Sequence, residues 1–114
     1  MGEIRGARIL ALEGDITKPL PLPAASLDIV YVSTVLHTFS RLGLEGFLRE
    51  AERLLKPGGR MAIVEIEKIE TPFGPPLSSR YSPEELKALV PMMPEKTVTV
   101  GAHFYLQTFR KPKA

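Results

Sequence analysis

Several polar residues follow apolar runs at places where a ligand site can form. Asp15 comes after the first run, Ser33 and Thr34 end the second, and His37 follows closely. In open α/β sheets, ligands bind outside the carboxyl ends of the strands. Because an imidazole changes its charge near neutral pH, His37 in that position is a candidate general base.

Each of these residues also has an ordinary structural explanation. Asp15 can cap a turn, and Ser33 and Thr34 can cap the segment that follows them. His37 can hold its loop by a hydrogen bond to the backbone. Glu65 lies in a third apolar run and needs a partner if it is buried, but the sequence does not identify one.

Composition places the chain among ordinary globular domains. It has 114 residues, 44% of them hydrophobic and 25% charged, which predicts a single domain. The net charge of +2 is too small to indicate a nucleic-acid partner, and the longest apolar runs are too short for a membrane span. The absence of cysteine excludes disulfides, thiolate metal sites and cysteine nucleophiles. We expect a cytoplasmic protein with no membrane partner.

The elements that must position these residues alternate between strands and helices, which predicts an α/β layered sheet. Short apolar runs of the kind buried in parallel sheets predict strands at residues 8–13, 27–33 and 60–66. Residues 97–100 and 104–109 predict a closing antiparallel hairpin.

Two helices are expected between these strands. Apolar residues at helical spacing run from Leu44 to Leu55, and the helix should end at Lys56, before Pro-Gly-Gly. A second helix should start after Ser82, with Pro83 at its first position and a capping box completed three residues after the cap.

Three segments carry a combined pattern: EGDITKPLPL at residues 13–22, SLDIVYVSTVLHTF at 26–39 and LLKPGGRMAIVE at 54–65. In this order and spacing they resemble the class I S-adenosylmethionine (SAM) methyltransferases, most of all the ubiquinone- and menaquinone-biosynthesis branch (type 11). The likeness covers the chain from about residue 8 onward.

The resemblance implies a partial Rossmann-like methyltransferase sheet. In that family the strand order is 3-2-1-4-5-7-6, with strand 7 antiparallel. Residues 8–13 would be strand 3, residues 27–33 strand 4, residues 60–66 strand 5, and the hairpin strands 6 and 7. Strands 1 and 2 have no counterpart, so we expect one N-terminally truncated domain over residues 1–114 with strands 3, 4, 5, 7 and 6.

The resemblance also assigns roles to the candidate residues. Asp15 would accept a hydrogen bond from the adenine amino group of SAM, and the backbone N–H of Ile16 would meet the ring. Ser33 and Thr34 would lie near the methionine part of SAM. His37 would orient the methyl acceptor or act as a general base.

The segment at residues 71–80 resembles the family loop that lies across the acceptor pocket. Pro75 and Arg80 are therefore candidate substrate-loop residues. Arg80 would pair with an anionic acceptor, or alternatively form an ion pair with Glu84 or Glu85 of the next helix.

Members of the family bind the amino-acid portion of SAM with a glycine-rich loop after strand 1, and its ribose hydroxyls with an acidic residue at the end of strand 2. The 114 residues contain neither, which would weaken SAM binding by about 5 kcal/mol or more. We therefore predict a domain that is inactive by itself and serves as an oligomeric or binding module. The alternative is one half of a split SAM-dependent methyltransferase that a partner chain completes. In both cases we expect a homodimer or a partner chain to cover the open edge of residues 27–33.

Overall fold

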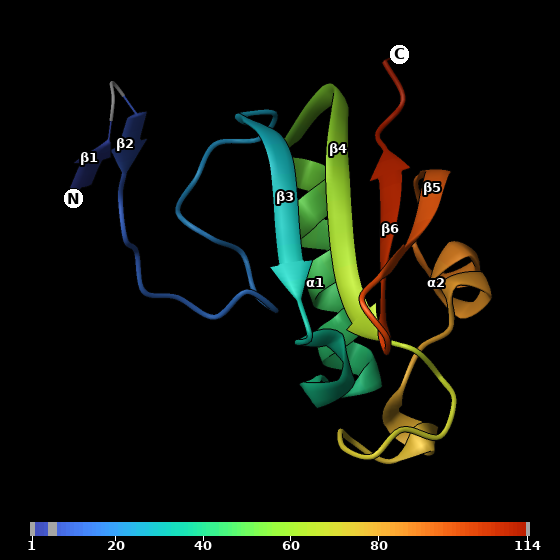
Figure 1. Ribbon diagram of the computed structural model, residues 1–114. Helices are drawn as coiled ribbons and strands as arrows, with labels where there is room; N and C mark the ends of the chain where they lie inside the picture. The colour runs from blue at the N-terminus through green and yellow to red at the C-terminus, as the bar shows by residue number, and fades with distance from the viewer. Residues whose placement is uncertain (1, 5–6, 114) are drawn as a thin grey trace.

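A four-stranded mixed sheet with helices packed on one face forms the body of the protein (Figure 1). The computed structural model describes residues 2–4 and 7–113. Its strands are β1 (Gly2–Ile4), β2 (Ala7–Ile9), β3 (Leu27–Ser33), β4 (Leu55–Ile66), β5 (Met93–Val100) and β6 (Phe104–Arg110). Its helices are α1 (Arg41–Leu54) and α2 (Pro83–Leu89), with short 3-10 turns η1 (Leu36–Thr38) and η2 (Leu77–Ser79).

The strand order is β3-β4-β6-β5. β3 runs parallel to β4, and β6 runs antiparallel to both β4 and β5. The hairpin between β5 and β6 turns at Gly101, whose φ of +67° suits a residue without a side chain. This order matches strands 4, 5, 7 and 6 of the expected sheet and confirms the α/β fold with its closing hairpin.

The strand expected at residues 8–13 does not join this sheet. β2 ends at Ile9 and pairs antiparallel with β1, and residues 10–15 form no strand. Figure 1 shows this N-terminal hairpin standing apart from β3. The expected order puts two further strands between residues 8–13 and β3, and the described residues contain neither. A strand without a neighbour cannot satisfy its backbone groups in a ladder.

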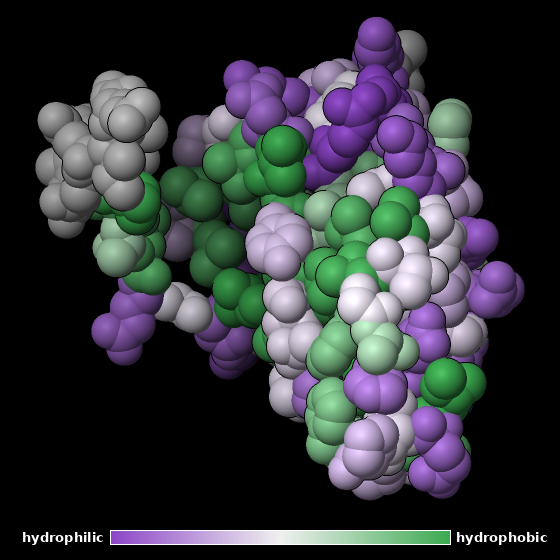
Figure 2. Space-filling view, viewed as in Figure 1, coloured by the Kyte–Doolittle hydropathy of each residue, from purple (hydrophilic) through white to green (hydrophobic). Residues whose placement is uncertain are grey.

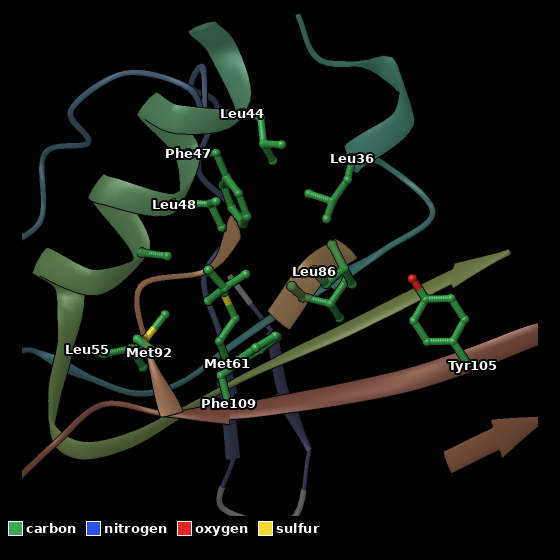
Figure 3. Packing of buried hydrophobic residues seen from close by; sticks show 13 residues of the cluster. Leu36, Leu44, Phe47, Leu48, Leu55, Met61, Leu86, Met92, Tyr105 and Phe109 are labelled. Carbon is green, nitrogen blue, oxygen red and sulfur yellow. The ribbon is translucent and has the colours of Figure 1, made fainter. Parts of the chain in front are cut away.

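The core lies between α1, α2 and one face of the sheet (Figure 3). Helix α1 begins at Arg41, earlier than the pattern predicted, because the Ser40 side chain accepts a hydrogen bond from Gly43 N at 3.0 Å. Its apolar stripe packs on alternate residues of β4 and β6, whose side chains point to the same face. The buried core residues include Leu44, Phe47, Leu48, Met61, Ile63, Leu86, Tyr105 and Phe109.

The opposite face of the sheet carries no helix among the described residues. Ile29 and Tyr31 of β3 are 62% and 61% exposed on that face. Val98 and Val100 of β5 are exposed too. Figure 2 shows hydrophobic side chains on the side turned toward the viewer. Exposed apolar patches mark interaction sites in many proteins, so this face is a candidate contact surface.

A pair of charged residues fastens the connector before β3 to helix α1. The buried carboxylate of Glu50 accepts a hydrogen bond from Leu20 N at 2.7 Å and two from the guanidinium of Arg53 at 2.6 and 2.8 Å. Arg53 donates in turn to the carbonyl oxygen of Leu20. A Cβ on Gly46 would lie 2.3 Å from the Thr17 carbonyl oxygen, so glycine is needed where the connector crosses the helix.

The long loop between β4 and α2 is organised around a buried arginine. The guanidinium of Arg80, 5% exposed, donates to the carbonyl oxygens of Pro75, Glu67, Ile69 and Phe73 at 2.8 to 3.2 Å. Helix α2 then starts with the predicted capping box, in which Ser82 and Glu85 exchange hydrogen bonds. These contacts give an irregular segment one fixed path over the end of the sheet.

We expect Glu50→Gln to lower the free energy of unfolding by roughly 1–2 kcal/mol near neutral pH, because it weakens charge-assisted hydrogen bonds. The hydrogen bonds from Arg53 and Leu20 lower the pKa of Glu50 from 4.5 to about 2. A depressed pKa gives stability that is complete above the unfolded value and is lost as the pH falls toward the folded value. The gap between wild type and variant should therefore shrink from pH 4.5 to 2 in urea titrations. Glu45→Gln, exposed on the same helix, is the control, and a gap that persists at pH 2 would contradict the assignment.

Arg80→Ala should destabilise the protein by about 3 kcal/mol, because four loop carbonyls lose a charged donor in a buried setting. Arg80→Lys should recover only part of this loss, since an ammonium cannot match the planar fork of donors. Thermal and urea unfolding measure both effects. Arg49→Ala, at an exposed position of α1, is the matched control. Equal unfolding free energies for Arg80→Ala and Arg49→Ala would refute this role.

Candidate functional site

The carboxyl ends of β3 and β4 meet at one edge of the sheet, as expected for neighbouring parallel strands. Thr34 leaves β3 with φ +54°, a left-handed backbone that is rare for a β-branched residue. Its N–H donates to Val64 O at 2.8 Å and its hydroxyl donates to Ser33 O at 2.8 Å. Strained backbone of this kind is held by its surroundings and concentrates at functional sites.

A buried carboxylate from β4 supports the turn that carries His37. Glu65, 1% exposed, accepts hydrogen bonds at Oε2 from the backbone N–H groups of Val35 and Leu36, both at 3.1 Å. Its other oxygen, Oε1, lies 3.6 Å from His37 Nδ1. Both of these atoms are buried, and neither has another hydrogen-bond partner among the described residues. The 3.6 Å separation is longer than a hydrogen bond, so the two atoms face each other without forming one.

His37 lines a cavity of about 260 Å³, which we call the His37 pocket. Its other walls are largely apolar, apart from Thr34 at the end of β3. They are Ile66, Phe73, Gly74, Pro75 and Phe104. Phe73 also packs edge-on against His103, with ring centroids 5.3 Å apart. A mostly apolar cavity with a few convergent polar groups is the usual form of a small-molecule site.

The substrate-loop residues divide between the wall and the scaffold of this pocket. Pro75 lines the pocket. Arg80 does not form the alternative ion pair with Glu84 or Glu85, because its guanidinium donates to loop carbonyls and Lys68 pairs with Glu85 at 2.9 Å. The reason is its burial inside the loop, where unpaired carbonyl oxygens demand a donor. Its pairing with an anionic acceptor stays a prediction. Arg80 shapes the pocket from behind.

Asp15 and Ile16 lie apart from the His37 pocket, on the connector. Asp15 Oδ1 accepts hydrogen bonds from Thr17 N at 2.9 Å and from the Thr17 hydroxyl at 2.7 Å, a capped turn. The Thr17 side chain, followed by its backbone N–H, lowers the pKa of the Asp15 carboxyl. Both bonds use Oδ1, so Oδ2 keeps its acceptor capacity among the described residues. Ile16 lines an apolar groove along β3 that also contains Val32.

The structure therefore brings Thr34, His37 and Pro75 to one pocket, with Ser33 exposed beside it. Glu65 is the residue whose role the sequence left open, because its partners lie about thirty positions away in the chain. Phe73 and Phe104 were not expected to line the pocket. An aromatic residue inside a proline- and glycine-rich loop was the available signal for Phe73.

Within the part of the chain that the structure describes, no group of three or more His, Asp or Glu side chains is arranged to bind a metal ion. Among residues 2–4 and 7–113, neither helix has the length and hydrophobicity to span a bilayer.

Comparison with known proteins places these residues in a family. The profile of the family described as "Methyltransferase domain" matches residues 3–63, more than half of the chain. Aclacinomycin 10-hydroxylase RdmB of Streptomyces purpurascens is 38% identical over 63 residues, which are 55% of this chain and 16% of that protein. This relative bears the name of a hydroxylase.

Solved structures agree with the fold and are longer than this chain. A SAM-dependent methyltransferase from Aquifex aeolicus matches with a TM-score of 0.75 and 25% identity, covering 93% of this chain and 55% of that one. Human N-acetylserotonin methyltransferase in complex with SAM matches with a TM-score of 0.69 and 24% identity, covering 89% of this chain and 33% of that one. The chain thus spans about half the length of the Aquifex structure. Given the match over residues 3–63, the chain belongs to the methyltransferase domain family.

Proposed function

We propose that this domain supplies the methyl-acceptor side of a SAM-dependent methyltransferase site, with His37 as the general base. One observation carries the proposal: His37 lines an apolar pocket while its Nδ1 faces the buried carboxylate of Glu65. A histidine held in this way keeps its Nε2 side for a ligand. A histidine that only supported its loop would not have to line a pocket.

The chemistry follows from the two ring nitrogens. In this proposal Nδ1 carries the ring proton, on the side that faces Glu65, so the neutral ring has its lone pair on Nε2. An acceptor hydroxyl in the pocket then donates to Nε2 and gives up its proton as the oxygen becomes a nucleophile. The nearby Glu65 carboxylate stabilises the imidazolium that forms. SAM, when bound, supplies an electrophilic methyl group.

The pocket favours one class of acceptor. Phe73, Phe104, Ile66 and Pro75 offer apolar and aromatic contacts, so the acceptor is a largely apolar molecule, suited to an aromatic ring. Since His37 is the base, the group to be methylated carries an ionisable proton. A phenolic hydroxyl combines both properties.

The residues present fit one side of a SAM site. The unpaired Oδ2 of Asp15 is available for the adenine amino group, with Ile16 beside it, and the strained turn at Thr34 brings bare backbone to the carboxyl edge. The remaining contacts, a glycine-rich loop and an acidic ribose ligand, do not occur in the 114 residues. We propose that these residues alone do not hold SAM and that a complementing segment, in the same or another polypeptide, completes the site.

The second candidate is an oligomeric or binding module without catalysis. The exposed apolar face and the open edge of β3 favour it. The 38% identical relative is named as a hydroxylase, so likeness to it does not support methyl transfer. What separates the candidates is whether a completed domain binds SAM and whether His37 is prepared as a base.

Calorimetric titration of the 114-residue chain with SAM should give a dissociation constant of roughly millimolar or weaker, because most of the cofactor grip is absent. A chimera that places the uncovered N-terminal part of the Aquifex methyltransferase before residue 8 should bind at micromolar concentration. In the chimera, Asp15→Ala should weaken binding by about tenfold for one lost hydrogen bond, while Asp28→Ala should not. Binding below about 100 µM by the chain alone would contradict the proposed division of the site.

Nitrogen-15 NMR of the imidazoles tests His37 without any ligand. The chain has two histidines, so His103 serves as an internal control in the same spectrum. We expect His37 to be in the Nδ1–H form, because Nδ1 faces Glu65, and Glu65→Gln to abolish that preference. The nitrogen-15 signals of His103 should be the same in wild type and in Glu65→Gln. A wild-type His37 with Nε2–H would remove the base from the proposed mechanism and leave the module.

A further inference from the structure

The outer edge of β3 is unpaired among the described residues and carries few of the features that protect an edge strand. β3 has seven residues and pairs with β4 on one side only. Ile29, Val30, Tyr31 and Val32 follow one another without a lysine or a proline. The single charged residue of β3 is Asp28, whose Oδ1 lies 3.3 Å from Lys56 Nζ. Such an edge is a template for another extended chain.

An apolar groove of about 280 Å³, the β3 groove, runs beside this edge. Val30 and Val32 form one wall, helix α1 contributes Phe47 and Ala51, and the connector contributes Leu20. An occupant must therefore do two things. Its backbone must be extended to pair with β3, and every second side chain must be apolar to fill the groove.

Residues 9–13, which we call the arm, meet both requirements. Ile9, Leu10 and Leu12 are 56%, 61% and 63% exposed. Three large apolar side chains so close together and so exposed are available for a contact with another surface. Residues 10–13 pair with no strand. Five extended residues span roughly 17 Å, which matches the central part of β3. In strand conformation Leu10 and Leu12 point to the same face, as groove filling requires.

We propose that two copies of this chain exchange arms, each arm lying along the β3 edge and groove of the other copy. The arm of the same copy stands apart from β3, as Figure 1 shows, and the connector that follows is fixed by Glu50 and Arg53 to helix α1. A two-fold axis uses the same contact twice and covers both open edges together. The partner is a second copy because the chain carries both halves of the contact. The proposal does not rest on methyl transfer.

The first test is the oligomeric state of the full chain. Sedimentation velocity should show a dimer at micromolar concentration, and the double variant Leu10→Asp, Leu12→Asp should raise its dissociation constant by about 100-fold or more, because each buried leucine is lost from both arms. Leu42→Asp is the matched control, since Leu42 is 78% exposed on α1, away from the arm. A wild-type monomer, or a dimer that the arm variant leaves intact, would overturn the proposal.

A mixing experiment separates arm exchange from any other dimer. An edge variant, Ile29→Lys with Tyr31→Lys, should be monomeric by itself, as should the arm variant. Mixed together, the two retain one intact contact, the wild-type arm of the edge variant in the wild-type groove of the arm variant. Exchange therefore predicts a heterodimer in the mixture, whereas packing of sheet face on sheet face predicts none. Circular dichroism of both variants must match wild type, and their thermal midpoints show that the fold is retained.

Discussion

A buried carboxylate at the end of β4 is the contact on which the site depends. Glu65 holds two backbone N–H groups of the turn after β3 with one oxygen and faces His37 with the other. A buried carboxylate needs hydrogen-bond donors, and the two backbone N–H groups on Oε2 tie the turn to the sheet, while Oε1 is left facing the imidazole. The carboxylate also couples two strands that are neighbours in space and distant in sequence.

A buried positive charge, that of Arg80, organises the loop across the pocket. Residues 67–80 contain several prolines and one close-packed glycine, Gly74, with φ +104° and a position near Ile66. Such a segment exposes carbonyl oxygens that no secondary structure satisfies. Arg80 supplies donors to four of them from inside the loop. Two buried charged residues thus support the elements that line the pocket, Glu65 behind the turn that carries His37 and Arg80 inside the loop.

Local signals in the sequence predicted helix caps and turns well, whereas contacts between residues far apart in the sequence could not be predicted. The cap at Ser82 and the hairpin that turns at Gly101 could be predicted, because caps, turns and apolar periodicity are encoded within a few residues. The strand order of the sheet was predicted from the family resemblance. The ion pair of Arg80 with Glu84 or Glu85 was wrong because the acceptors of Arg80 are carbonyl groups, which every residue has and no pattern marks. Residues 8–13 failed as a sheet strand because pairing requires a neighbour that the described residues do not contain.

The edge of β3 links the two proposals. In the family order, strand 1 lies beside strand 4, so a segment that completes the SAM site must pair with the same backbone groups of β3 that an exchanged arm would use. One edge cannot form two ladders at once. The two proposals therefore exclude each other at any one β3 edge. An arm-exchanged dimer would hold the proposed acceptor side, with His37 and Glu65 in place, without the segment that completes the cofactor site. On these proposals, the relative affinity of β3 for the two strands, rather than the chemistry in the pocket, sets how much of the domain can be completed.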